Sequence, residues 1–158
     1  MISVRTFALL LGLTASDFAA AEVAPQRLLV IVSPSQSITD ISLADLRRIY
    51  LGQLSRWPTR HRIVVVVPSP RSPEGAFFIK HVINMAELDY SQHWIGAVFR
   101  GQAAAAPLVA ASPAEAKRFV ASQPDAIAVI AEVMTDSSVR VLTVDGKQAS
   151  AADYPLNR

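Results

Sequence analysis

Apolar and polar residues follow one another along the chain in an order that predicts strands separated by helices. Short runs of branched apolar residues, bounded by proline, glycine or aspartate, are typical of buried strands. Such runs are expected to form strands over residues 27–33, 62–67, 126–131 and 139–144. The segments between them carry apolar residues at helical spacing. This order predicts an α/β domain with a mostly parallel sheet flanked by helices.

Capping residues mark the start of the predicted helices. Ser42, Ser72 and Ser112 each precede an apolar stripe at helical spacing, and a proline follows two of them at the first helical position. A further helix is expected over about 87–100, with four residues on its apolar side: Tyr90, Trp94, Ile95 and Val98. The alanine- and proline-rich segment 101–113 is expected to be a surface loop.

The buried faces of these elements are expected to share one core. Its predicted members are Leu29, Ile31, Leu46, Ile49, Val64, Val66, Phe78, Val82, Trp94, Phe119, Ile127 and Val129. The domain is expected to span residues 22–146 and to end at the turn residues Asp145 and Gly146. Residues 147–158 are expected to form a poorly ordered C-terminal tail.

The first 21 residues have the layout of a secretory signal peptide. Arg5 supplies a positive charge, residues 6–15 form a short apolar run, and the alanines at 19–21 offer small residues before a cut that follows Ala21. The apolar run is shorter than the roughly 20 residues that span a bilayer. An uncleaved anchor or a buried helix is the alternative. The sequence therefore predicts export.

The composition suits one globular domain in a periplasm. The chain has 158 residues, of which 51% are apolar and 18% charged, and its net charge is +2. It contains no cysteine, so the fold is expected to rest on its core without disulfides. A lipid-modified cysteine is excluded for the same reason. We therefore expect a free periplasmic protein that does not insert into the membrane after signal cleavage.

No motif of a known catalytic site is present, and no cofactor or metal is expected. The three histidines, His61, His81 and His93, have no acidic neighbours at the spacing of a metal site. Six arginines lie between residues 46 and 73, where they form either a solvated basic face or a region that attracts anions. They are Arg47, Arg48, Arg56, Arg60, Arg62 and Arg71. Nucleic acid is not expected as a partner of an exported chain with few aromatic residues.

The segment 64–78 is the strongest candidate for a binding site. A strand of four valines ends in a turn that carries Arg71 and Ser72 directly before a helix. Helix N-termini expose N–H groups and carry a partial positive charge, so they attract anions. Pro73, however, lacks an N–H, and Glu74 already supplies negative charge. A helix that is capped for structural reasons alone is therefore the alternative.

The candidate oxyanion site combines this turn with the end of the first strand. Ligands of parallel α/β sheets gather at the carboxyl ends of the strands, so the serines at the end of the strand 27–33 are expected to face the same crevice. The candidate ligand-binding residues are Ser33, Ser35, Arg71, Ser72, Glu74 and Gly75.

Four segments together resemble the periplasmic phosphate-binding proteins of ABC transporters. They read SLADLRRIYLGQLSRW, RIVVVVPSPRSPEGAFFIKHVINM, HWIGAVFRGQ and RFVASQPDAIAVI, in this order. In that family a helix with L-x-x-I-Y-L-G is followed by a tryptophan, a strand and a Ser-Gly-Thr helix start, a later tryptophan helix and a strand P-G-A-I-G-Y-V. The resemblance covers about residues 27–146 and implies one lobe of a type 2 periplasmic binding protein.

The resemblance implies a non-enzymatic, exported solute-binding protein related to phosphate uptake. Its ligand would be phosphate or another oxyanion, and a membrane permease would be its partner. The family's Ser-Gly-Thr falls on Ser72, Pro73 and Glu74 in this chain, so oxyanion binding is expected to be weak. Full members have two lobes, whereas this chain has room for about one. The alternative is an interaction module, a single lobe that docks on a partner protein and has no ligand of its own.

Overall fold

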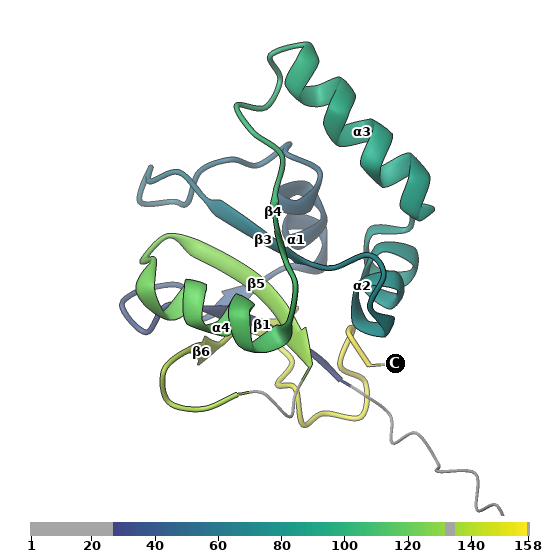
Figure 1. Ribbon diagram of the computed structural model, residues 1–158. Coiled ribbons are helices and arrows are strands. Elements are labelled where there is room, and N and C mark those ends of the chain that lie inside the picture. The colour runs from purple at the N-terminus through teal and green to yellow at the C-terminus, as the bar shows by residue number, and fades with distance from the viewer. Residues whose placement is uncertain (1–26, 132–134, 158) are drawn as a thin grey trace, which may run out of the picture.

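Strands and helices alternate in the computed structural model, which describes residues 27–131 and 135–157 (Figure 1). The predicted signal peptide lies outside the described residues. The elements are β1 (Leu28–Val32), β2 (Asp40–Ile41), α1 (Leu43–Tyr50), β3 (Val64–Pro68), α2 (Pro73–Phe77), the π-helix η1 (Phe78–Ile83), α3 (Glu87–Phe99), β4 (Leu108–Ala110), α4 (Pro113–Ser122), β5 (Ala126–Ala131), β6 (Arg140–Val141) and β7 (Thr143–Val144).

A five-stranded sheet in the order β4-β3-β5-β1-β6 forms the centre of the fold. The strand β3 pairs in parallel with β4 and β5, and a separate parallel pair joins β2 to β7. The strand β1 runs antiparallel to its neighbours β5 and β6. The predicted α/β class with a mostly parallel sheet is thus confirmed, but β1 has the opposite direction to β3 and β5.

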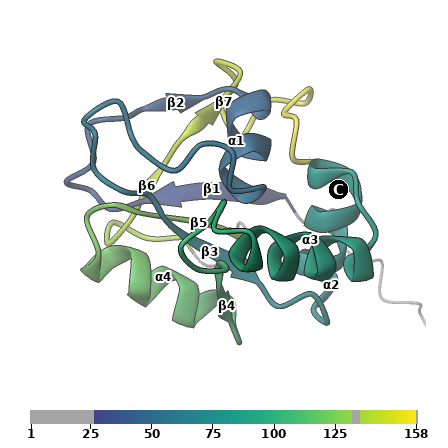
Figure 2. The ribbon, with the colours of Figure 1, turned by 90° about the horizontal axis from the view of Figure 1, so that it is seen from above.

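Helices cover both faces of this sheet. Figures 1 and 2 show α4 on one face and α1 on the other, with β3 and β5 between them. Serine caps begin three of the helices as predicted, because the side chains of Ser42, Ser72 and Ser112 each accept a hydrogen bond from the N–H three residues later. Within the described ranges, no helix combines the length and the apolar character needed to cross a membrane.

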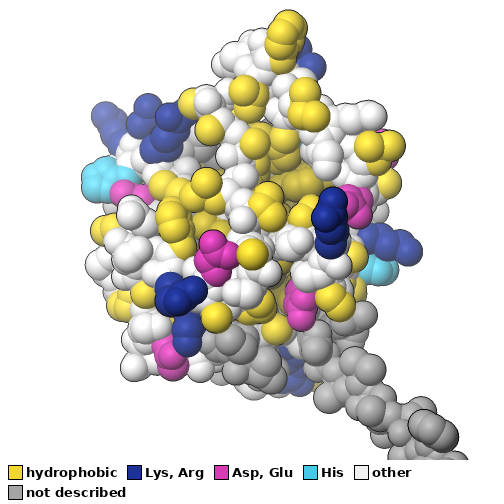
Figure 3. Space-filling model, in the orientation of Figure 1, with side chains coloured by type: hydrophobic (Ala, Val, Ile, Leu, Met, Phe, Trp, Pro, Cys, Tyr) yellow, Lys and Arg dark blue, Asp and Glu magenta, His cyan; other side chains and the backbone are white. Residues whose placement is uncertain are grey.

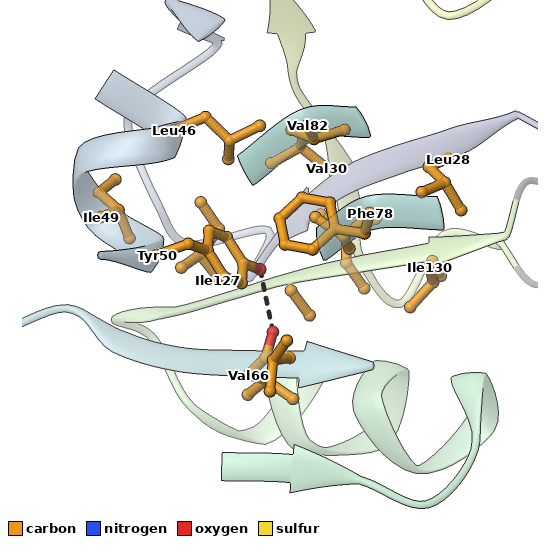
Figure 4. Packing of buried hydrophobic residues seen from close by; sticks show 14 of the residues in the cluster. Leu28, Val30, Leu46, Ile49, Tyr50, Val66, Phe78, Val82, Ile127 and Ile130 are labelled. Atoms are coloured by element: carbon orange, nitrogen blue, oxygen red, sulfur yellow. Dashed lines mark hydrogen bonds between the residues drawn. The ribbon is translucent and has the colours of Figure 1, made fainter. Parts of the chain in front are cut away.

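The core between α1, η1 and the sheet is centred on two aromatic rings. Tyr50 and Phe78 are completely buried and meet edge to face, with ring centroids 4.7 Å apart (Figure 4). The Tyr50 hydroxyl donates a hydrogen bond to the carbonyl of Val66 at 2.9 Å, so this polar atom is satisfied inside the core. Of the predicted core residues, Val64 and Phe119 are only partly buried and the others are buried.

Tyr50 and Gly52 of the I-Y-L-G motif hold α3 against α1 through their contacts with Tyr90 and Trp94. The carbonyl of Tyr50 accepts hydrogen bonds from the Tyr90 hydroxyl at 3.0 Å and from the Trp94 indole at 3.2 Å. Burial raises the pKa of Tyr90 to about 12, so this hydroxyl remains a donor at physiological pH. Gly52 has a φ of 74°, and a Cβ there would lie 2.8 Å from the Trp94 ring. The other tryptophan, Trp57, contacts a different part of the fold: its indole donates to the carbonyl of Asp125, directly before β5, at 3.1 Å.

Three expectations from the sequence are wrong in detail. The predicted loop 101–113 contains the strand β4, and the predicted strand 139–144 is divided between β6 and β7 of different sheets. On α3, the inward-facing residues are Tyr90, Trp94 and Ala97, whereas Ile95 and Val98 are exposed. The apolar side of this helix was misplaced because apolar residues occur on two of its faces.

The C-terminal segment is also not a loose tail. Tyr154 and Leu156 are buried, and the carbonyl of Leu156 accepts a hydrogen bond from the N–H of Leu28 at 3.1 Å. The last described residues therefore complete the core beside the start of β1. Tyr154 and Leu156 are the only large apolar residues of this stretch, which is too few to give a recognisable periodic pattern.

Candidate functional site

The turn between β3 and α2 is folded back on the start of the helix. The Ser72 hydroxyl accepts a hydrogen bond from the N–H of Gly75 at 3.1 Å and donates one to the carbonyl of Ser69 at 2.8 Å. A Cβ on Gly75 would lie only 2.0 Å from that same carbonyl oxygen, so glycine is required for this close approach. The donor proton of Ser72 is thus already engaged within the turn.

Two donors of the turn remain available to an external anion. The Arg71 side chain is exposed and makes no hydrogen bond or ion pair with other described residues. The N–H of Glu74 likewise has no partner within the described part of the chain, because the cap serves Gly75 and the N–H of Ala76 donates to the carbonyl of Ser72. The partly buried Glu74 carboxylate opposes an anion at this position.

The space next to this turn is too small to enclose phosphate. A cavity of about 20 Å³ lies between the starts of α2 and α4, and its lining includes Ser69, Ser72, Glu74 and Ser112. This volume holds about one water molecule. Any oxyanion at the turn would therefore bind on the open surface of this chain.

Ser33 and Ser35 lie at the opposite end of the sheet from this turn. Val32, the last residue of β1, pairs with Ile127 near the start of β5. The strand β3 runs parallel to β5, so the end of β3 lies near the end of β5. The two serine hydroxyls bond to one another at 2.9 Å. The expectation that they share a crevice with Arg71 is therefore wrong, and its cause is the antiparallel direction of β1.

Several other polar candidates make structural contacts. Arg47 donates to the carbonyl of Val82, and Arg48 forms an ion pair with Asp45 at 3.0 Å, so these two arginines are engaged within the fold. His93 makes a 2.9 Å hydrogen bond with the carbonyl of Leu51. Among the described residues, no three metal-ligating side chains lie together.

A large apolar groove between α3 and β4 was not predicted from the sequence. Its volume is about 580 Å³, and it is lined by Val67, Pro70, Tyr90, Ser91, Trp94, Ile95, Val98, Phe99, Ala106, Pro107 and Val109. Figure 3 shows hydrophobic side chains gathered on the side of the molecule that carries these elements. The apolar residues on two sides of the helix 87–99 were the signal in the sequence for such a surface.

The chain is similar to phosphate-binding proteins in sequence and in fold. It is 24% identical over 155 residues to the phosphate-binding protein PstS of Bacillus subtilis, covering 92% of this chain and 46% of that protein. An ABC-type phosphate transport receptor from Vibrio cholerae superposes with a TM-score of 0.68 at 18% identity, over 85% of this chain and 54% of that one. The chain is a single-lobe-sized relative of these proteins.

Two further comparisons define the extent of this relationship. PstS from Borrelia burgdorferi has a TM-score of 0.67 at 16% identity and is covered to 55% of its length. No protein family model matches the chain. The chain thus spans about half the length of the phosphate-binding proteins that it matches. The Bacillus subtilis relative is a phosphate-binding protein, and the Vibrio cholerae structure is that of a phosphate transport receptor.

Proposed function

We propose that this chain is an exported, non-enzymatic binding-protein lobe of a phosphate uptake system. In this proposal its β3–α2 turn forms one half of a weak oxyanion site, and a second protein surface closes over it. The observation that carries the proposal is a pair of donors at the carboxyl end of β3, the exposed Arg71 guanidinium and the Glu74 N–H, neither of which has a partner among the described residues. The chemistry of the relatives' ligand, phosphate, fits these donors.

The small cavity beside the turn supports a half site over a complete one. Small-molecule sites are usually concave and bury most of the ligand, and pockets of about 300–1,000 Å³ are typical. A space of about 20 Å³ does not meet this requirement. Half of the enclosing surface would have to come from another lobe, which agrees with a chain that spans about half of its relatives.

A lobe that docks on a partner without any ligand is the second candidate function. Its support is the Ser72 hydroxyl, both of whose hydrogen bonds lie inside the turn. Pro73 and the Glu74 carboxylate also make the helix start less favourable for anions than a Ser-Gly-Thr sequence would. A measurement of oxyanion binding separates the two candidates.

The proposal predicts opposite effects of two substitutions on phosphate affinity measured by calorimetry. Arg71→Ala is expected to weaken binding about tenfold, because it removes a charge-assisted hydrogen bond. Glu74→Thr is expected to strengthen binding, because it removes a repelling carboxylate. Arg62→Ala is the matched control, since it removes another exposed arginine, which precedes the start of β3, and should leave affinity unchanged.

The same titrations with sulfate and small carboxylates establish which oxyanion is preferred. If the wild-type chain binds none of these anions at millimolar concentration, the half-site proposal fails and the ligand-free docking lobe is favoured. Equal affinities of the wild type and both turn variants would also contradict the proposal.

A further inference from the structure

The outer face of α3 is apolar although nothing within the described part of the chain covers it. Tyr90 and Trp94 fix the inner face to the carbonyl of Tyr50, so the helix cannot turn its outer face inward. On the outer face Ile95 is 71% exposed and Phe99 is 92% exposed. A helix that is apolar on both sides is usually buried on both sides. The outer face of α3 is therefore expected to be covered by another protein surface.

The strand β4 next to this helix is an open edge of the sheet. It is the terminal strand in the order β4-β3-β5-β1-β6, and among the described residues only β3 pairs with it. Its residues Leu108, Val109 and Ala110 carry no charge, and Val109 is 58% exposed. Open edges that lack charged side chains are prone to pair with another strand.

We propose that β4 and the outer face of α3 form the interface of a symmetric dimer of this chain. In this dimer β4 pairs antiparallel with β4 of a second copy, near a two-fold axis at Val109, and the two α3 helices pack across the same axis. The two central sheets then join into one. Each copy inserts Phe99 into the apolar surface of the other.

The charges around the groove favour a second copy as its occupant. A two-fold axis places identical surfaces opposite each other, so charged residues near it would repel, and none of the residues that line this groove is charged. Antiparallel α3 helices bring Arg100 at the end of one helix toward Glu87 and Asp89 at the start of the other. Opposite charges and opposite helix ends therefore face one another.

The size of the exposed apolar surface also fits a dimer. The large exposed side chains on these two elements are Leu88, Ile95, Val98, Phe99, Leu108 and Val109. Together they expose on the order of several hundred Å² of surface, the size at which an apolar patch marks an interaction site. With the β4 backbone and its rim, this approaches the roughly 800 Å² per partner of a stable interface.

The proposed interface reaches the β3–α2 turn but does not depend on a ligand there. Pro70, the neighbour of Arg71, lines the groove, so a second copy would lie beside the proposed oxyanion half site. A dimer without oxyanion binding would leave this inference intact, and a monomer that binds phosphate would overturn it. The two proposals can therefore fail separately.

The first test is the mass of the purified chain in solution, measured by sedimentation and light scattering. The wild type is expected to be a dimer at micromolar concentration, and Phe99→Asp is expected to raise the dissociation constant about a hundredfold or more. Val141→Asp is the matched control, because Val141 is an exposed apolar residue on β6, the opposite edge of the sheet. A wild-type monomer, or a dimer that only Val141→Asp disrupts, would overturn the proposal.

The second test uses the absence of cysteine from the chain. Cα atoms of residues facing each other in an antiparallel pair are about 4.5–5.5 Å apart, within the range that a disulfide bridges. Mild oxidation of Val109→Cys is therefore expected to give a disulfide-linked dimer, whereas Val141→Cys should remain a monomer on a denaturing gel. Failure of Val109→Cys to cross-link, with its circular dichroism unchanged, would rule out the proposed pairing.

Discussion

Replacing Phe78 by alanine is expected to lower the free energy of unfolding by about 3–5 kcal/mol. This ring is completely buried and packs edge to face on Tyr50 between α1, η1 and the sheet. Its removal leaves a cavity inside the core. Val82 and Ile83 on the same helix are buried as well, so η1 cannot move to fill this space without disturbing their packing. Chemical denaturation followed by circular dichroism measures the change.

Lys80→Ala is the control for this prediction. Lys80 lies on the same π-helix η1, but its side chain is exposed, so its truncation should shift the free energy of unfolding by less than about 0.5 kcal/mol. If Phe78→Ala and Lys80→Ala gave equal denaturation midpoints, the packing of η1 against α1 would be incorrect.

Truncating Leu156 to alanine is expected to lower the free energy of unfolding by about 2–5 kcal/mol. Leu156 is completely buried although it stands near the end of the chain, and its carbonyl accepts a hydrogen bond from Leu28 at the start of β1. The last residues would thus act as part of the core and not as a tail. Thermal or urea unfolding of the variant tests this directly.

Gln148→Ala provides the comparison within the same C-terminal segment. The Gln148 side chain is exposed, so its loss should leave the unfolding midpoint nearly unchanged. A stable Leu156→Ala variant that unfolds like the wild type would show that residues 147–157 do not contribute to the core.

Local patterns predicted the elements of this fold more reliably than their arrangement. Serine caps and apolar runs placed α1, α4, β3 and β5 close to their observed bounds. The direction of β1 could not be predicted, because a strand that is buried along its whole length has the same composition in either direction. That one direction separates Ser33 and Ser35 from the β3–α2 turn.

The residues that carry the family resemblance are packing residues. Tyr50, Gly52, Trp57 and Trp94 bind or pack against backbone and rings inside the domain. A sequence that keeps them keeps the contact between α1 and α3, whether or not it keeps a ligand. For this reason the resemblance was a good guide to the fold and a weaker guide to the oxyanion site.

Short elements and long-range contacts explain the other differences. The strand β4 has only three residues and follows a run of alanines, so no periodic pattern marked it. Its pairing with β3 depends on residues some forty positions earlier in the chain. The groove between β4 and α3 exists only because these two elements meet in space, which local sequence patterns do not encode.

The most direct test of the proposed oxyanion half site is a phosphate titration of the isotope-labelled chain, followed through its amide NMR resonances. We expect shifts concentrated at the amides of Glu74 and Gly75 and at Arg71, and we expect these shifts to saturate at millimolar phosphate. The amides of Ser33 and Ser35, at the other end of the sheet, should stay unchanged. Shifts centred on those two serines, or no shifts at all, would contradict the proposed half site at the β3–α2 turn.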